Sequence, residues 1–350
     1  MTPEFWQKKR VFLTGHTGFK GSWLSLWLQM MGAEVHGFSL VPSSEPNLFT
    51  VARVAEGMSG NTIADIRNYA NVRDAIIKCE PEIIIHMAAQ PLVRHSYIEP
   101  VETYATNVMG TVHVLDIARQ TSSVKAIVVI STDKCYENKE WLWGYREGDS
   151  FGGHDPYSNS KACAEMVTST YRYSFFKNSG CAVATARAGN VIGGGDWATD
   201  RLVPDILRAF ENNKPVIIRN PQSTRPWQHV LEPLSGYLTL AEMLYNEGQT
   251  FAEGWNFGPE NEDARTVQWI TECLAICWGN GASWQNDEGK HPYEAQYLKL
   301  DISKAKAKLD WYPQWSLKHS IGKTVEWHQA FIENLDMRAF TIEQILTYKS

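Results

Sequence analysis

Two short groups of polar residues in this chain have types and spacings suited to chemistry. Tyr157 lies four residues before Lys161, so that both side chains share one face of a helix. Because a nearby positive charge favours an ionised phenol, this pair predicts a tyrosine that loses its proton near neutral pH. The triplet Thr132-Asp133-Lys134 adds a hydroxyl, a carboxyl and an amine. These groups exceed what simple alcohol oxidation requires, and they indicate an elimination step.

A structural role for the triplet is the competing interpretation. Asp133 could cap a helix or lie in a loop, with Lys134 as its ion-pair partner. Both motifs are expected at the carboxyl ends of strands, where doubly wound sheets place their ligands, and we therefore favour an acid role for Asp133. Whether Lys134 is the base or only an ion-pair partner stays open, because a lysine acts as a base only where burial or a neighbouring cation lowers its pKa.

The elements that position these groups are read from hydrophobic patterns. Short apolar segments predict strands at residues 10–14, 34–38, 82–86, 126–130 and 182–186, and periodic segments predict helices at 22–31, 101–119 and 234–244. Strands that are apolar on both faces, with helices between them, are typical of a parallel sheet. The fold expected is α/β, a doubly wound Rossmann-type sheet with a smaller mixed C-terminal lobe.

A glycine cluster, Gly15, Gly18 and Gly21, lies between the first strand and the first helix. Glycines at this position let the backbone approach a pyrophosphate at a helix N-terminus, where free N–H groups favour anions. A tight turn without a ligand is the alternative. An acidic residue is expected about 20 positions later to bind the adenosine ribose of NAD. The second strand ends at Ser39 instead, which predicts a weaker hold on the ribose.

Composition changes near Asn190, where Gly-, Pro- and Trp-rich segments begin. We expect a dinucleotide-binding domain over residues 1–189, with a return segment near 230–258. A substrate lobe is expected over residues 190–350. The chain has no internal repeats.

The overall charge and cysteine content narrow the class of protein. Lys and Arg number 33 against 39 Asp and Glu, a net charge of −6, so no basic field attracts nucleic acid or anionic membrane. The N-terminus is too polar for a secretory signal, and no apolar run reaches the ~18 residues of a membrane-spanning helix. The six cysteines lack a paired C-x-x-C arrangement. We therefore expect a cytoplasmic protein with free thiols and no metal site.

The motifs together resemble the extended short-chain dehydrogenase/reductase family and, within it, the nucleotide-sugar 4,6-dehydratases. The resemblance covers nearly the whole chain. It is carried by Gly15-x-x-Gly18-x-x-Gly21, Asp65-Ile66-Arg67, His86-Met87-Ala88-Ala89-Gln90, Asn107-x-x-Gly110-Thr111, Ser131-Thr132-Asp133, Tyr157-x-x-x-Lys161 and Arg187-x-x-Asn190-Val191. Most members have glutamate where this chain has Lys134. That departure, with segments 19–24 and 225–230, is similar to the branch that acts on CDP-D-glucose.

The resemblance implies a reaction on a nucleotide-sugar substrate with NAD as cofactor. Tyr157 would take the proton of the sugar 4-hydroxyl, Lys161 would lower the tyrosine pKa and hold the nicotinamide ribose, and Thr132 would orient the C4 oxygen. Asp133 would then protonate the departing 6-hydroxyl while Lys134 accepts the C5 proton. The product would be a 4-keto-6-deoxy sugar for deoxysugar and O-antigen precursor synthesis, with NAD regenerated.

The resemblance also implies two sets of binding residues. The cofactor set is Gly15, His16, Gly18, Phe19, Lys20, Gly21, Asp65, Ile66, Ala88, Ala89, Gln90, Asn107, Tyr157 and Lys161. The substrate set is Gln90, Asn190, Arg219, Arg225, Tyr293 and Tyr297. A planar guanidinium can clamp phosphate oxygens through two hydrogen bonds, and Arg225, within the Trp-rich motif, is the best candidate for this role. His229 in the same motif is interpreted as structural.

A homodimer or homotetramer is expected, built through the helix before Thr121 and the helix that carries Tyr157. The apolar positions on the second helix are Ala162, Cys163, Ala164, Val167 and Tyr171. Two alternative functions stay open, a nucleotide-sugar 4-epimerase and a 4,6-dehydratase of another nucleotide-hexose, whereas the presence of Tyr157, Lys161 and Thr132 together argues against a non-catalytic dinucleotide sensor. Formation of a 4-keto product would distinguish a dehydratase from an epimerase.

Overall fold

The computed structural model describes residues 2–287, 289 and 297–349, and its main feature is a seven-stranded sheet in the order β10-β6-β5-β4-β1-β2-β3. All neighbouring strands in this sheet run parallel. The strands are β1 (Arg10–Thr14), β2 (Glu34–Ser39), β3 (Gly60–Ile63), β4 (Ile83–His86), β5 (Ala126–Ile130), β6 (Ala182–Ala188) and β10 (Gly254–Phe257). This arrangement confirms the predicted doubly wound α/β fold.

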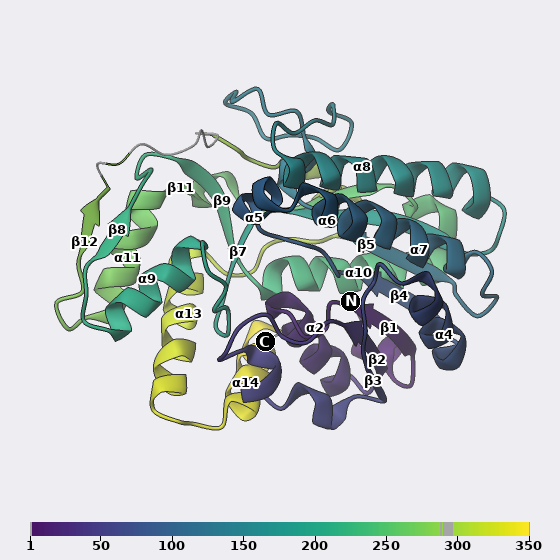
Figure 1. The fold of residues 1–350 in the computed structure, drawn as a ribbon, viewed down its shortest axis with the longest axis horizontal. Helices are drawn as coiled ribbons and strands as arrows, with labels where there is room; N and C mark the ends of the chain where they lie inside the picture. Colours follow the sequence, from purple (N-terminus) through teal and green to yellow (C-terminus); the bar gives the residue numbers. More distant parts are fainter. Residues whose placement is uncertain (1, 288, 290–296, 350) are drawn as a thin grey trace.

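Helices cover both faces of the sheet (Figure 1). Because successive strand residues point to opposite faces, Val11 and Leu13 pack on one side and Phe12 on the other. On the side of Val11 lie α2 (Phe19–Met30), α10 (Leu231–Glu247) and α14 (Met337–Lys349). On the side of Phe12 lie α4 (Tyr69–Cys79), α7 (Gly110–Ala118) and α8 (Pro156–Tyr171). The buried apolar residues of both faces hold the carboxyl ends of the strands at one edge.

A smaller lobe follows β6 and lies beside the end of the sheet in Figure 1. It contains the small sheets β11-β9-β7 and β12-β8 and a separate apolar core. Its elements are β7 (Asn190–Ile192), α9 (Leu202–Glu211), β8 (Val216–Ile218), β9 (Thr224–His229), β11 (Ala264–Thr266), α11 (Val267–Trp278), β12 (Trp284–Asn286) and α13 (Leu317–Ile332). The chain returns to the large sheet through α10 and β10. The division at residues 189 and 190 stays a prediction.

Short elements connect these layers. They are α1 (Pro3–Trp6), α3 (Leu48–Val51), α5 (Val93–Ile98), α6 (Pro100–Tyr104), α12 (Ser303–Leu309), the 3-10 turns Val54–Gly57, Asp133–Cys135, Gly248–Phe251 and Asn261–Asp263, and the π-helical turns Ala105–Met109 and Arg172–Phe176. Among the residues described, no helix is both long and apolar enough to cross a membrane, and no group of three or more His, Cys, Asp or Glu side chains could hold a metal ion.

Most of the expected elements are present with small changes at their ends. The strands at 10–14 and 126–130 have the predicted bounds, whereas α2 begins at Phe19 rather than residue 22. The helix expected at 101–119 is interrupted by the π-helical turn Ala105–Met109. Strand β3 was not predicted, because its residues Asn61, Thr62 and Ile63 are exposed on the edge of the sheet and show no apolar pattern.

The surface expected for self-association needs one correction. Ala162 and Ala164 are each only 2% exposed, because they pack inside the chain, and so they cannot contact a second copy. Exposed apolar side chains nearby are Met166 on α8 and Tyr173 and Phe175 in the following π-helical turn.

Candidate active site

Helix α8 carries Tyr157 and Lys161 past the carboxyl end of β5. Asp155 caps the helix, since its side chain accepts a hydrogen bond from the Ser158 backbone N–H at 2.9 Å. The Lys161 ammonium donates to the carbonyl of Ile130, the last residue of β5, at 2.8 Å. The cap and this bond place the predicted pair at the edge of the sheet where ligands of doubly wound folds bind.

The protonation of the Tyr157 and Lys161 pair differs from the sequence prediction. Burial raises the pKa of Tyr157 to about 12, although a hydrogen bond with Thr132 opposes the shift. Burial also lowers the pKa of Lys161 to about 8. In the protein without bound ligands, burial therefore opposes the ionisation near neutral pH that the sequence predicts. The physical reason is that the buried phenol loses hydration while the Lys161 ammonium is bonded to Ile130.

The triplet Thr132-Asp133-Lys134 begins where β5 ends. Asp133 is only 2% exposed, and its Oδ1 accepts a hydrogen bond from Thr132 Oγ1 at 3.0 Å. Its Oδ2 is buried and has no hydrogen-bond partner in the part of the chain that the structure describes. Burial raises the pKa of Asp133 above its ordinary value, against the opposing charges of Lys134 and Arg225. These features favour the protonated carboxyl that an acid role requires.

Further cations surround this carboxyl. Lys20, in the first turn of α2, lies close enough to Lys161 and Asp133 for their charges to affect it, and burial lowers its pKa to about 7. Arg201 is bonded to Asp196 at 2.8 Å, and the Asp196 charge raises the pKa of Arg201. Lys20, Arg201 and Arg225 therefore place cationic groups close to the two motifs. Such a site suits an anionic ligand such as a diphosphate.

The glycine loop has the shape expected for a pyrophosphate site. Gly15 has φ +77°, and a Cβ at this position would lie 2.8 Å from the Ala88 backbone nitrogen. A Cβ at Gly21 would collide with the Gly15 carbonyl oxygen. Gly18 is the N-cap of α2 and provides no side-chain bond to the first N–H groups of the helix. The loop thus needs glycine for its own packing and presents N–H groups that suit an anion.

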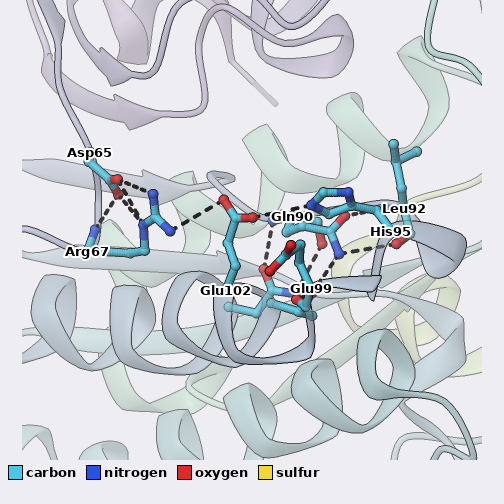
Figure 2. Close-up of polar contacts among 9 residues, drawn as sticks. Asp65, Arg67, Gln90, Leu92, His95, Glu99 and Glu102 are labelled. Carbon is cyan, nitrogen blue, oxygen red and sulfur yellow. Dashed lines mark hydrogen bonds and ion pairs between the residues drawn. The ribbon is translucent and has the colours of Figure 1, made fainter. Parts of the chain in front are cut away.

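Other residues of the predicted cofactor set are bonded within the protein. The Asp65 carboxylate accepts from Arg67 Nη2 at 2.6 Å, and Figure 2 shows Arg67 between Asp65 and Glu102. His16 is buried, with Nε2 at 2.8 Å from Asn61 Oδ1. Contacts of these two side chains with a cofactor stay predictions.

Gln90 and Asn107 form a hydrogen-bonded pair beside the loop. The Asn107 side chain accepts from Gln90 N at 2.8 Å and donates to Gln90 O at 3.1 Å. The Gln90 amide bonds to both backbone groups of Leu92 and to Thr103 Oγ1, as Figure 2 shows for Leu92. A substrate contact of Gln90 would have to replace these bonds. The remaining cofactor candidates are Phe19, Ala88 and Ala89, which are half-buried, and Ile66, which is buried.

Apart from Gln90, the predicted substrate residues that the structure describes lie in or against the smaller lobe. Asn190 on β7 pairs in register with Trp227 on β9, the strand that also carries Arg225. Arg219 lies 3.7 Å from Asp200, next to Arg201. Tyr297 forms an isolated bridge with Thr224 at the start of β9. Tyr293 lies outside the described residues. Tyr297 therefore pairs with the residue that precedes Arg225 on β9, and the Arg225 charge acts on Asp133.

Sequence patterns did not identify two residues next to the motifs. Arg201 lies close to Tyr157, and the only local signal for it is Asp196, five residues earlier in the glycine-rich loop. Ser96 accepts a hydrogen bond from the Tyr157 backbone N–H at 3.1 Å. No signal for Ser96 exists in the sequence, because it lies 61 residues away in α5.

Comparison with known proteins gives relatives along the whole chain. A family model described as GDP-mannose 4,6 dehydratase matches residues 12–324. A CDP-glucose 4,6-dehydratase of Salmonella typhimurium is 57% identical over 351 residues, covering 99% of this chain and 98% of that protein. The structure of dTDP-glucose 4,6-dehydratase from Bacillus anthracis in complex with NAD has a TM-score of 0.77 at 21% identity, covering 93% and 98% of the two chains.

A solved UDP-glucose 4-epimerase from Thermus thermophilus in complex with NAD has a TM-score of 0.78 at 22% identity, covering 91% of this chain and 99% of that one. At such identities the two solved structures establish the fold alone. The family model and the Salmonella relative confirm the predicted resemblance to nucleotide-sugar 4,6-dehydratases. The chain belongs to the GDP-mannose 4,6 dehydratase family.

Proposed function

We propose that this protein is an NAD-dependent dehydratase that converts CDP-D-glucose to CDP-4-keto-6-deoxy-D-glucose. The single observation that carries the reaction type is the buried Asp133 carboxyl, with its raised pKa and its unpartnered Oδ2 among the described residues, close to Tyr157. An oxidoreductase that only exchanges hydrogen at C4 has no use for such an acid. The relative from Salmonella typhimurium supports CDP-glucose as the substrate.

The residues at the glycine loop fit NAD. The close approach of Gly15 to Ala88 and the uncapped start of α2 would hold the pyrophosphate. Lys161 would contact the nicotinamide ribose, and Lys20 would add positive charge. Bound NAD would supply the group that takes hydrogen from C4 and returns it to C6.

Tyr157 would start the reaction by taking the proton of the 4-hydroxyl. Burial raises the pKa of Tyr157 to about 12 even though the Arg201 charge already opposes the shift, so ionisation of the phenol would need further positive charge, which Lys161 would supply once ligands bind. The Thr132 hydroxyl, which now donates to Asp133, would turn to donate a hydrogen bond to the C4 oxygen of the sugar and so orient it. The resulting 4-keto group acidifies the proton at C5.

Elimination across C5 and C6 would use the adjacent carboxyl and amine. Asp133 would give its proton to the departing 6-hydroxyl, which leaves as water, and Lys134 would accept the C5 proton. Arg225, whose positive charge already affects Asp133, and Arg219 would hold the diphosphate of the substrate. The base role of Lys134 is part of this proposal. The variant Lys134→Met tests it directly, because methionine lacks the amine but keeps most of the side-chain length.

Incubation with nucleotide-hexoses tests the proposed function. The purified protein with NAD and CDP-D-glucose should form a product with the alkaline ultraviolet absorbance of a 4-keto-6-deoxy sugar. Parallel reactions with dTDP-, GDP- and UDP-hexoses test the nucleotide specificity. A 4-epimer without a keto product would refute dehydration, and preferential turnover of another nucleotide would refute the substrate assignment alone.

Several broader proposals accompany this function. We infer a cytoplasmic homodimer or homotetramer that supplies deoxysugar and O-antigen precursors, without nucleic acid or membrane partners. We also keep the proposed division between a cofactor domain at residues 1–189 and a substrate lobe at residues 190–350. The exposed apolar side chains Met166, Tyr173 and Phe175 support self-association. Sedimentation at micromolar concentration would measure the oligomeric state.

A further inference from the structure

A buried histidine connects the glycine loop to the interior of the fold. His86 is the last residue of β4 and pairs in register with Thr14, the last residue of β1. It is only 2% exposed. Its Nδ1 lies 2.8 Å from Thr14 Oγ1, and its Nε2 lies 3.2 Å from Thr111 Oγ1 on α7. The imidazole therefore bridges two hydroxyls from different elements.

The neighbouring bonds determine which nitrogen of His86 carries the proton. Thr111 Oγ1 donates its single proton to the Asn107 carbonyl at 2.7 Å, so it must accept a hydrogen bond from His86 Nε2. Thr14 Oγ1 accepts the backbone N–H groups of Met87 and Ala88, each at 3.0 Å, and so its own proton is available for His86 Nδ1. All bonds are satisfied by a neutral ring with its proton on Nε2. Burial, which lowers the pKa of His86 to about 3, agrees with this neutral form.

The chain of bonds continues to the helix that carries the tyrosine. Asn107 lies in the π-helical turn before α7, and its Nδ2 donates to Ser160 Oγ at 2.8 Å. Ser160 Oγ donates in turn to the backbone carbonyl of Tyr157 at 2.7 Å. Hydrogen bonds thus link the glycine loop, β4, the π-helical turn and α8.

We propose that His86 is a positioning residue, whose neutral Nε2–H imidazole sets the spacing between the glycine loop and the helix that carries Tyr157. The catalytic consequence rests on the proposed function, because this spacing would align the substrate C4 with the cofactor. A displacement of about 1 Å at a reacting centre can reduce the rate by roughly 100-fold. A residue that only fills the core would affect stability without changing the alignment.

The proton position is tested first by nitrogen-15 NMR of histidine-labelled full-length protein without NAD. The spectrum should contain one histidine with an unprotonated Nδ1 and a protonated Nε2 at near-neutral pH, and its signals should vanish in His86→Gln. A proton on Nδ1, or a charged ring, would overturn the proposal. This measurement is independent of turnover, so it decides on the tautomer even if CDP-D-glucose is not the substrate.

Two variants then test the positioning role. His86→Leu removes both bonds and should reduce kcat about 100-fold per folded molecule. It should also increase the isotope effect of substrate deuterated at C4, because C4 oxidation becomes rate-limiting. His86→Gln keeps an amide N–H for Thr111 and should recover part of the rate. The matched control is His328→Gln, which alters another buried histidine, 4% exposed, in the smaller lobe.

Stability measurements separate the two interpretations. His328→Gln should lower the unfolding temperature without changing the isotope effect. If His86→Leu loses activity only in proportion to its loss of folded protein, with an unchanged isotope effect, His86 has a packing role and the proposal is wrong. Equal kcat for His86→Leu and His86→Gln would also contradict it, because the bond to Thr111 would then have no effect on alignment.

Discussion

Replacing Asp133 by asparagine should separate the two halves of the proposed reaction. The amide keeps the shape of the carboxyl and an oxygen for the bond from Thr132 Oγ1, which is 3.0 Å long, but it has no acidic proton for the 6-hydroxyl. Oxidation at C4 depends on Tyr157 and should continue. Loss of a general acid costs about 10²- to 10⁴-fold in rate. We expect elimination to slow by this factor, so that reduced cofactor accumulates.

The same change should stabilise the fold at neutral and higher pH. Burial raises the folded-state pKa of Asp133 above the unfolded value, so stability falls as pH rises from the unfolded pKa through the folded one. Each unit of this difference corresponds to about 1.4 kcal/mol of unfolding free energy. Asparagine has no charge to desolvate. The variant should therefore be more stable than the wild type at about pH 8, and this advantage should disappear below the unfolded pKa, near pH 3.

Two measurements check this prediction. Stopped-flow absorbance of the reduced nicotinamide reports C4 oxidation and the delay before elimination in a single turnover. Denaturant unfolding at several pH values gives the stability difference. Asp263→Asn is a matched control, because burial also raises the pKa of Asp263 but this carboxyl lies in the smaller lobe. If oxidation and elimination slow together and no reduced cofactor is seen, the separate acid role of Asp133 is refuted.

Four further predictions concern single residues. Tyr157→Phe should abolish turnover while NAD affinity, measured by titration, stays nearly unchanged, whereas Lys161→Met should impair both; an equal loss of NAD affinity in the two variants would mean that Tyr157 mainly positions the cofactor. Ser39→Asp should tighten NAD binding about 10- to 100-fold, equivalent to roughly 1.5–3 kcal/mol for a charge-assisted bond, and weaken NADP binding; unchanged calorimetric affinities would place the ribose elsewhere. Glu165→Gln should cost about 3–5 kcal/mol of unfolding free energy, because it removes the charge partner of the Arg187 guanidinium, which is bonded at 2.7 Å and only 3% exposed. A loss below about 1 kcal/mol, which is typical of an exposed ion pair, would contradict this prediction. Burial lowers the folded-state pKa of His229 to about 3, whereas the unfolded value is about 6.5. The folded protein should therefore lose roughly 2 kcal/mol of unfolding free energy through this residue when the pH falls from 7 to 5. Denaturant unfolding of His229→Gln should show a loss of unfolding free energy over this pH range that is smaller by about the same amount.

The sequence allowed accurate prediction of the central strands, whereas the roles of the two motifs stay predictions. Residues 126–130 form a buried strand as expected, because five consecutive apolar residues suit a strand covered on both faces. Strand β3 was missed, because an exposed edge strand gains little from apolar side chains. The π-helical turn that holds Asn107 was also missed, since its bonds to Gln90 and Ser160 come from distant segments.

The sequence by itself determined which reactive groups are present and which share an element. Helical spacing placed Tyr157 and Lys161 on one face, and glycine identity specified the loop at Gly15, because these depend on local backbone geometry. Only the tertiary structure decided their protonation and direction. Lys161 is bonded to Ile130, and Asp133 and Tyr157 have raised pKa values because segments far apart in the chain remove water from around them. Desolvation depends on the whole surrounding fold, and a local pattern of residues does not contain it.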